Sequence, residues 1–157
     1  MKAVLLLLIL FNFSLLLADD YILEFQANVK IIKEYNISNN EKFRSYELKG
    51  TFTDEYGNYG KFEGIVISDV KDGKLIKLEG TAKIIYSNDE IIYLKAYRRK
   101  SDFDAGVANA KIIGSSENYK SLIGTKCIQS VRYFEDTIFG LQKCNLSEGL
   151  AQLLKNS

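Results

Sequence analysis

Apolar and polar residues alternate along most of the chain with the period of two that is typical of half-buried β-strands. The clearest run starts at Tyr21, where every odd position up to Ile31 is apolar and the even positions from Glu24 to Lys30 are polar. About eight segments of this kind, joined mostly by short turns, predict an all-β fold built as a single antiparallel meander. Closure would leave no edge strand, so we expect a closed barrel, with an open coiled sheet or a sandwich as the alternative.

The strongest hairpin signal is Asp72-Gly73, because this dipeptide suits a two-residue turn. A turn centred there pairs Ile67 with Leu78, apolar against apolar. The same register would move the earlier apolar positions of the first strand to the wrong face. We therefore expect a β-bulge near Gly64, where an extra residue reverses the alternation.

The two cysteines, Cys127 and Cys144, lie in apolar stretches on either side of Glu135-Asp136. In a hairpin folded symmetrically about that pair, opposed residues have numbers that sum to 271, and those of the two cysteines do. At a non-hydrogen-bonded pair the Cα atoms lie about 4.5 Å apart, which a disulfide tolerates. We therefore predict a disulfide between them, with two buried free thiols as the alternative.

The period changes in the C-terminal segment 145–157. Its leucines are spaced at helical intervals, and Asn145 followed three residues later by Glu148 matches a capping box. We expect a short amphipathic helix that packs over the strands just beyond the disulfide. Gly149 opposes this helix by about 1 kcal/mol of propensity.

Residues 1–18 have the pattern of a secretory signal peptide: Lys2 near the start, an apolar run from Val4 to Leu17, and Ala18 before two aspartates. The run is shorter than the roughly 20 residues needed to span a bilayer, and a retained anchor is the alternative. We therefore expect a secreted or periplasmic protein with no stable membrane insertion after cleavage. Residues 19–157 would then form a single β-barrel domain.

Composition excludes several chemistries. The chain contains no His, so a Ser-His-Asp or Cys-His nucleophile, an imidazole acid or base and a His-ligated metal are all excluded. Lys2 is the only charged residue before residue 19, so the remaining 20 basic side chains balance 20 acidic ones. With a net charge of zero we expect no nucleic-acid partner. We also expect no metal and no cofactor.

Two stretches of the chain echo each other, GNYGKFEGIVI at 57–67 and ENYKSLIGTKC at 117–127. Both place an aromatic residue, a small residue and an aliphatic pair after a turn, so we expect each to start a strand. From Tyr59 to Tyr133 the pattern resembles secreted barrels of the allene oxide cyclase and dirigent families, although both copies lack the usual Gly-Thr-Gly. The resemblance implies an eight-stranded barrel with a cavity for an oily or aromatic molecule. It carries over no catalytic residue.

Polar side chains on predicted inward positions are the candidate ligand-binding residues. Small residues along one side of segment 105–114 leave room for a ligand or for large neighbours. An apolar pocket with a few polar groups is the ordinary form of a small-molecule site, and tyrosine hydroxyls need partners when they are buried. Each candidate is alternatively a barrel-mouth residue with a satisfied hydrogen bond. The candidates are Arg98, Gln129, Tyr86, Tyr133 and Tyr46.

Three functions remain open from the sequence. The first is a barrel that binds a small hydrophobic molecule in its interior without catalysis. The second is a solid-core envelope or interaction protein whose surface, including Tyr93 and Tyr97, meets a protein partner. The third is a cyclase or isomerase of the resembled families, which would need an inward carboxylate, with Glu47 and Glu63 as the nearest candidates.

Overall fold

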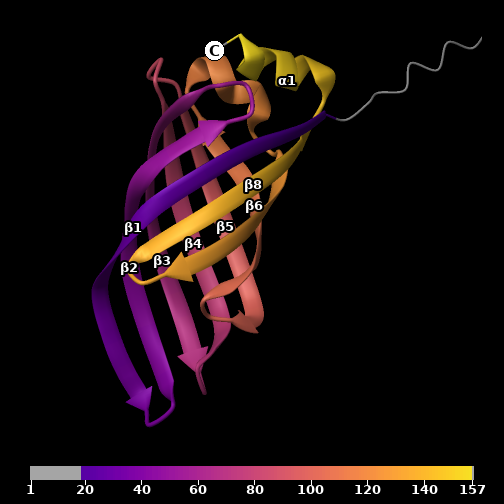
Figure 1. Cartoon of the computed structure of the whole chain (residues 1–157). Coiled ribbons are helices and arrows are strands. Elements are labelled where there is room, and N and C mark those ends of the chain that lie inside the picture. The colour runs from indigo at the N-terminus through magenta and orange to yellow at the C-terminus, as the bar shows by residue number, and fades with distance from the viewer. Residues whose placement is uncertain (1–18, 157) are drawn as a thin grey trace, which may run out of the picture.

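The computed structural model describes residues 19–156, and these form a closed barrel of eight antiparallel strands in sequence order, as predicted (Figure 1). A short C-terminal helix follows the last strand. The predicted signal peptide, residues 1–18, lies outside the described residues. The elements are β1 (Asp19–Ser38), β2 (Glu41–Asp54), β3 (Tyr59–Lys71), β4 (Lys74–Tyr86), β5 (Ile91–Asp102), β6 (Ala105–Ser115), the 3₁₀ helix η1 (Glu117–Leu122), β7 (Lys126–Phe134), β8 (Thr137–Leu146) and α1 (Glu148–Lys155).

Alternation along each strand separates the barrel interior from its outer face. In β1 the side chains of Tyr21, Leu23 and Phe25 are buried, whereas those of Glu24 and Gln26 are exposed. The ring of Phe25 stacks on that of Phe62 in β3, with centroids 4.4 Å apart. Burial of these large apolar surfaces is the main driving force for closure of the sheet.

The β1–β2 hairpin is longer than the rest of the barrel. β1 pairs with β8 only from Asp19 to Asn28, and the residues beyond pair with β2 alone. Figure 1 shows this hairpin projecting past the end of β8. Two register shifts, after Ile31 and after Asn36, distort the free edge of β1. Bulges of this kind protect an edge against pairing with another chain.

The turn between β3 and β4 is centred on Asp72-Gly73, as predicted, and both residues have positive φ, 52° and 74°. The predicted register is wrong. Ile67 lies opposite Glu79 rather than Leu78, so every pair beyond the turn region is shifted by one residue. Ile67 consequently faces outward and is exposed.

The extra residue that causes this shift is Ile76, which stands between the pairs Val70–Leu75 and Asp69–Lys77. The bulge predicted at Gly64 is therefore wrong, because Gly64 pairs regularly on both sides. A bulge was needed to keep the apolar positions on one face, and β4 supplies it next to the turn instead.

The second of the two echoing stretches does not start a strand. Residues Glu117–Leu122 form η1, and β7 begins only at Lys126. The side chains of Tyr119 and Leu122, three positions apart, are both buried beneath η1. This spacing is the three-residue repeat of a 3₁₀ helix, so the prediction of a strand here is wrong.

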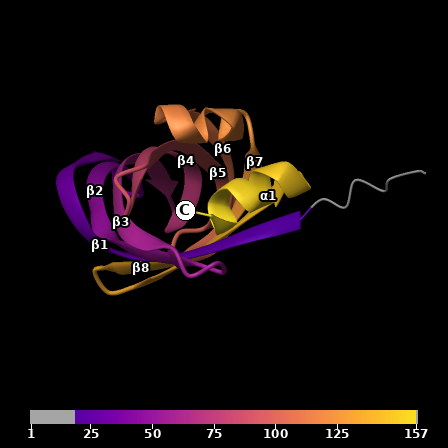
Figure 2. The same ribbon diagram turned by 90° about the horizontal axis from the view of Figure 1, so that it is seen from above.

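The predicted C-terminal helix is confirmed as α1, which lies with η1 at one end of the barrel (Figure 2). Its N-cap is Ser147, without a side-chain capping bond, and Asn145 belongs to β8. The capping box predicted at Asn145 is therefore wrong. Ala151 and Leu154 are buried against the barrel, and the amide of Asn58 donates to the Leu154 carbonyl at 2.8 Å.

Candidate functional site

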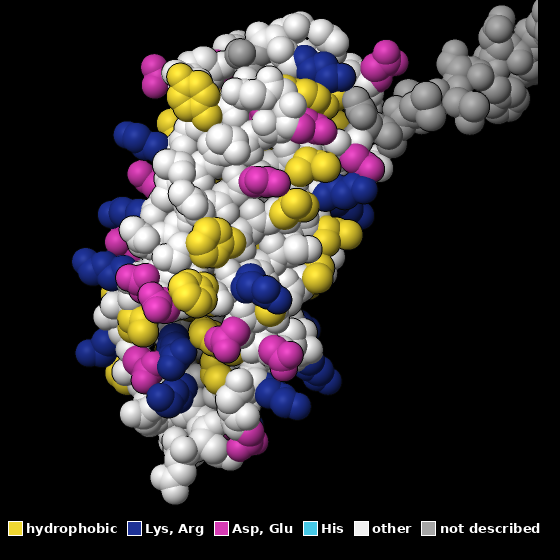
Figure 3. Space-filling view, in the orientation of Figure 1, with side chains coloured by type: hydrophobic (Ala, Val, Ile, Leu, Met, Phe, Trp, Pro, Cys, Tyr) yellow, Lys and Arg dark blue, Asp and Glu magenta, His cyan; other side chains and the backbone are white. Residues whose placement is uncertain are grey.

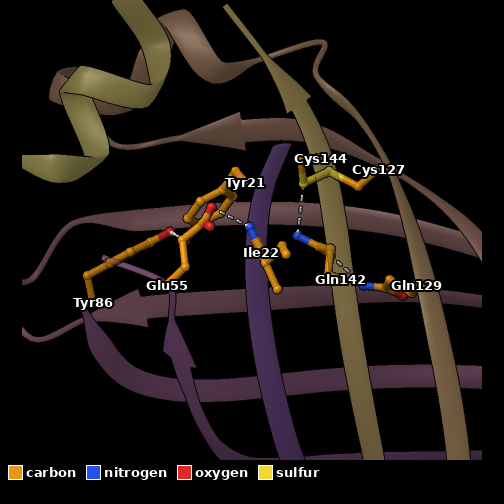
Figure 4. Close-up of a disulfide and its surroundings, with 8 residues drawn as sticks. All are labelled: Tyr21, Ile22, Glu55, Tyr86, Cys127, Gln129, Gln142 and Cys144. Carbon is orange, nitrogen blue, oxygen red and sulfur yellow. Dashed lines mark hydrogen bonds between the residues drawn. A yellow bond between two sulfur atoms is a disulfide. The ribbon is translucent and has the colours of Figure 1, made fainter. Parts of the chain in front are cut away.

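The predicted disulfide is confirmed. Cys127 in β7 lies opposite Cys144 in β8, with Cα atoms 4.1 Å apart and the sulfur atoms bonded (Figure 4). The whole β7–β8 hairpin keeps the symmetric register about Glu135-Asp136. The same symmetry places Gln129 opposite Gln142, since their numbers also sum to 271. Gln142 was not among the candidate residues predicted from the sequence.

Two hydrogen bonds link Gln129, through Gln142, to the disulfide. Gln129 Nε2 donates to Gln142 Oε1 at 2.7 Å, and Gln142 Nε2 donates to Cys144 Sγ at 3.3 Å (Figure 4). Both glutamines face inward and are buried. Gln129, a predicted ligand residue, is thus oriented by Gln142.

Tyr86, another predicted ligand residue, belongs to the closure of the barrel end beneath α1. Its hydroxyl lies 2.9 Å from that of Tyr21, which donates to Asp54 Oδ2 at 2.8 Å. Asp54 also accepts bonds from the backbone and side chain of Asn58. Burial raises the pKa of Tyr21 and that of Tyr86, so both phenols stay neutral. This arrangement closes the barrel and uses the only hydroxyl proton of Tyr86, so Tyr86 has none left to donate to a molecule in the barrel centre.

The other end of the barrel brings together Tyr46, Tyr133 and Arg98. The two tyrosine hydroxyls lie 3.0 Å apart. The Arg98 side chain is 2% exposed, and its Nη2 donates to the Phe103 carbonyl at 2.7 Å. Phe103 stacks on Tyr133 at 5.6 Å, and Arg44 lies over the Phe103 ring at 5.2 Å, so these groups cover this end.

The five predicted ligand residues therefore do not converge on one site. Arg98, Tyr46 and Tyr133 lie together at one end, Gln129 lies further along β7, and Tyr86 lies at the α1 end. A cavity of about 50 Å³ occupies the interior, and Arg98, Gln129 and Tyr133 contribute to its wall. Sites for drug-sized molecules usually span about 300–1,000 Å³. The interior is thus mostly filled by side chains.

The two carboxylates nominated for catalysis face outward. Glu47 forms an ion pair with Lys49 at 2.8 Å, and Glu63 is exposed on the outer face of β3. Neither can reach a molecule in the interior. A cyclase or isomerase chemistry based on either residue therefore has no inward acid or base.

The outer face of β5–β8 has a one-sided charge that the balanced composition hides. No Asp or Glu occurs from Ile91 to Arg99 in β5 or anywhere in β6, β7 and β8. The outward, exposed side chains of these strands form what we call the basic face. Its cationic members are Lys95, Arg99, Lys111, Lys126, Arg132 and Lys143.

Three of these lysines are directly opposed across neighbouring strands. Lys95 pairs with Lys111, and Lys111 pairs with Lys126. Within residues 19–156, none of the three forms an ion pair, whereas Lys143 binds Asp20 at 2.7 Å. Like charges directly opposite in a sheet destabilise it by some tenths of a kcal/mol per pair. The row is therefore a local cost to stability.

The basic face is also hollowed and partly apolar. Its lysines surround a depression of about 880 Å³, to which Tyr97, Ile113 and Ile128 contribute apolar surface. Tyr93 and Tyr97, the two tyrosines expected on the surface, are 39% and 48% exposed. The side of the barrel seen in Figure 3 carries exposed hydrophobic side chains among both basic and acidic ones. The basic face is created by register across four strands, so no local motif could have revealed it.

In comparisons with family models, with curated proteins and with solved structures, nothing matches this chain. The resemblance to the allene oxide cyclase and dirigent barrels therefore stays a prediction. Among residues 19–156 there is no helix long and apolar enough to cross a bilayer. The same residues include no group of three or more side chains placed to hold a metal ion.

Proposed function

We propose that this protein is a non-catalytic interaction protein whose basic face binds an acidic segment of a protein partner. The observation that carries the proposal is the row of Lys95, Lys111 and Lys126, which form no ion pair within residues 19–156 and lie beside exposed apolar side chains. An acidic partner would supply the charges that the sheet lacks. The row would then stabilise the complex instead of destabilising the free protein.

The shape of the face favours a protein segment over other anionic partners. Tyr97, Ile113 and Ile128 lie in a depression, where a segment carrying both carboxylates and apolar side chains can contact them and the lysines together. A flat bilayer surface would reach the rim more easily than the floor. A nucleic acid would offer phosphates but little apolar surface for the two isoleucines.

The small volume of the interior cavity also supports a binding site on the outer face. This cavity of about 50 Å³ is smaller than the sites that hold drug-sized molecules, whereas the depression on the basic face is about 880 Å³. The expected binding of a small hydrophobic molecule inside the barrel stays a prediction. The setting we propose is secreted or periplasmic, and the disulfide supports it because such bonds persist in oxidising compartments.

The test uses two labelled peptides of equal length, one made of Glu alone and one with Glu and Leu alternating in an amphipathic pattern. We expect the amphipathic peptide to bind more tightly, with an affinity that falls as salt rises from about 20 to about 200 mM. Replacing Lys95, Lys111 and Lys126 together by Ser should weaken binding by about tenfold, equivalent to about 0.5 kcal/mol per lysine.

The matched control replaces Lys49, Lys61 and Lys71, on the outer face of β2 and β3, by Ser. It changes the net charge equally and should weaken binding less than about twofold. Equal losses in the two triple variants would contradict the proposal. Tighter binding to phosphatidylglycerol vesicles or to a single-stranded oligonucleotide than to the amphipathic peptide would also contradict the proposal. The basic face would then belong to another class of partner.

A further inference from the structure

The buried guanidinium of Arg98 has more hydrogen-bond donors than partners. Of its five N–H groups, the one on Nε and the two on Nη1 have no partner, while Nη2 donates to the carbonyls of Phe103 and Asp102. The side chain is 2% exposed, so solvent outside the barrel does not satisfy them. Buried polar groups are nearly always paired, and an unpaired one needs an explanation.

The charge of Arg98 is also uncompensated. Within residues 19–156 it forms no ion pair, and Asp104, the carboxylate whose field reaches it, is exposed in the β5–β6 loop. A buried charge without a counter-charge is strongly unfavourable, and arginine does not lose its proton at ordinary pH. An anion beside the guanidinium would remove this cost.

A space for that anion exists. Arg98 lines the interior cavity of about 50 Å³, which at 10–15 Å³ for each water would hold roughly three to five water molecules. Small side chains in β5 and β6, Ala96 and Ala108, leave this room. At Gly106 an added Cβ would lie 3.1 Å from the guanidinium, so that glycine makes room for Arg98 itself.

A second donor accompanies the guanidinium. The hydroxyls of Tyr46 and Tyr133 contain two protons, and their mutual bond uses one of them. Tyr133 also lines the cavity. The site therefore combines one positive charge with spare N–H and O–H donors, and apolar residues such as Leu78 and Val131 form the rest of its wall. Such a surface suits an ion that only accepts hydrogen bonds.

We propose that the barrel interior binds one small monovalent anion, a halide or a short carboxylate such as formate or acetate, on Arg98. The inference is independent of the basic face. Larger anions are excluded by the volume of the cavity, and dianions by the single positive charge. The Phe103 and Tyr133 rings cover the end of the barrel next to the site.

The first test measures thermal unfolding of the whole protein in sodium salts at equal ionic strength, with gluconate as the reference because it exceeds the cavity. Chloride and bromide form one arm, and formate and acetate form the other. We expect the melting temperature to rise by about 4 °C when the bound ion is at ten times its dissociation constant. The arm with the larger rise identifies a halide or a carboxylate site.

Two variants distinguish anion binding in the barrel interior from anion binding on the outer surface. Arg98→Met should lose the anion-dependent rise, whereas Arg99→Met, which removes the adjacent outward guanidinium, should keep it. Because the basic face also attracts anions, the rise must persist when Lys95, Lys111 and Lys126 are replaced by Ser. A rise that persists in Arg98→Met, or equal melting temperatures in all salts, would overturn the proposal.

A second measurement needs no variant, in case Arg98→Met does not fold. In crystals of the unmodified protein grown with bromide, we expect an anomalous peak within hydrogen-bond distance of Arg98 Nε or Nη1 when the site takes halides. With formate in place of bromide, the corresponding planar density belongs there when it takes carboxylates. Water alone at this position under both conditions would show that the donors are hydrated and would refute the site.

Discussion

At the scale of single residues, a glycine in β8 allows two core phenylalanines, Phe25 and Phe62, to stack closely. Gly140 lies opposite Phe25, and a Cβ added to it would lie 2.1 Å from the Phe25 ring. The ring cannot easily move away, because it stacks on Phe62 with an interplanar angle of 8°. The glycine is therefore part of the packing of the aromatic pair.

We expect Gly140→Ala to lower the free energy of unfolding by about 1–3 kcal/mol, the usual cost of overpacking a core. Urea unfolding followed by circular dichroism would measure the change. Gly149→Ala is the matched control, because nothing lies within 4 Å of its added Cβ and Ala favours the helix by up to about 1 kcal/mol. Equal stability of Gly140→Ala and the unmodified protein would show that the Phe25 ring is free to shift.

The disulfide gives a second prediction at this scale. The cysteines are 17 positions apart, and closing a loop of this size stabilises a protein by about 3 kcal/mol in the chain-entropy model. Replacing both by Ser should lower the free energy of unfolding by that amount without changing the barrel, because regular pairing from Ile128–Lys143 to Phe134–Thr137 also holds the β7–β8 register. Dithiothreitol should lower the stability of the unmodified protein to the same level and leave the variant unchanged. A variant as stable as the oxidised protein would contradict the prediction.

The face of the sheet toward which a side chain points could be predicted from the sequence, but the hydrogen-bond donors that stay unpaired could not. The inward orientation of Arg98 and Gln129 follows from their alternation with apolar neighbours, and it is confirmed by their burial. Gln129 is bonded to Gln142, whereas Nε and Nη1 of Arg98 have no partner, and this difference depends on which side chains the closed barrel brings opposite them. Gln142 could have been found from the hairpin symmetry, whereas the unpaired donors of Arg98 could not.

At the scale of elements, predictions succeeded where the chain was regular and failed where one residue broke the period. The β7–β8 hairpin keeps one register throughout, so the pairing of Cys127 with Cys144 followed from numbering alone. In β3–β4 the turn was predicted correctly, but the extra residue Ile76 shifted every later pair. An isoleucine is a good strand residue in either register, so its sequence context gave no sign of a bulge.

The lysine row gives a prediction at the same scale. Lys111 is the middle residue and faces a lysine on each side, so Lys111→Gln should raise the free energy of unfolding by about 0.2–1 kcal/mol. The gain should shrink at about 1 M salt, where charges are screened over a few ångströms. The same substitution should weaken binding of the amphipathic acidic peptide. Lys61→Gln, on the outer face of β3, should change neither property by a comparable amount.

At the scale of the whole molecule, the two ends of the barrel are closed by different chemistry. At one end Tyr21, Tyr86 and Asp54 form a fully bonded network beneath α1. At the other, Tyr46 and Tyr133 pair beside Arg98, whose donors are in excess. The all-β class and the closed meander could be predicted from alternation and turn spacing. The contrast between a hydroxyl network and a guanidinium with spare donors depends on closure and could not.

These buried phenols make the stability of the whole barrel sensitive to alkaline pH. Burial raises the pKa of four tyrosines, Tyr21, Tyr46, Tyr86 and Tyr133. An unfolded tyrosine has a pKa of about 10, so above that pH the unfolded chain loses protons that the native state keeps. The stability these groups contribute is thus fully present below about pH 9 and is lost as the pH rises further.

We expect the free energy of unfolding to fall between about pH 10 and 11 by up to about 1.4 kcal/mol per pH unit for each of the four tyrosines. Urea unfolding at a series of pH values would give the slope, and tyrosinate absorbance should show these phenols ionising only as the protein unfolds. Replacing both Tyr46 and Tyr133 by Phe removes two of the groups and their mutual bond together, so the variant should fold and show a shallower slope. An unchanged slope in that variant would mean that the pair at the Arg98 end does not remain protonated in the native barrel.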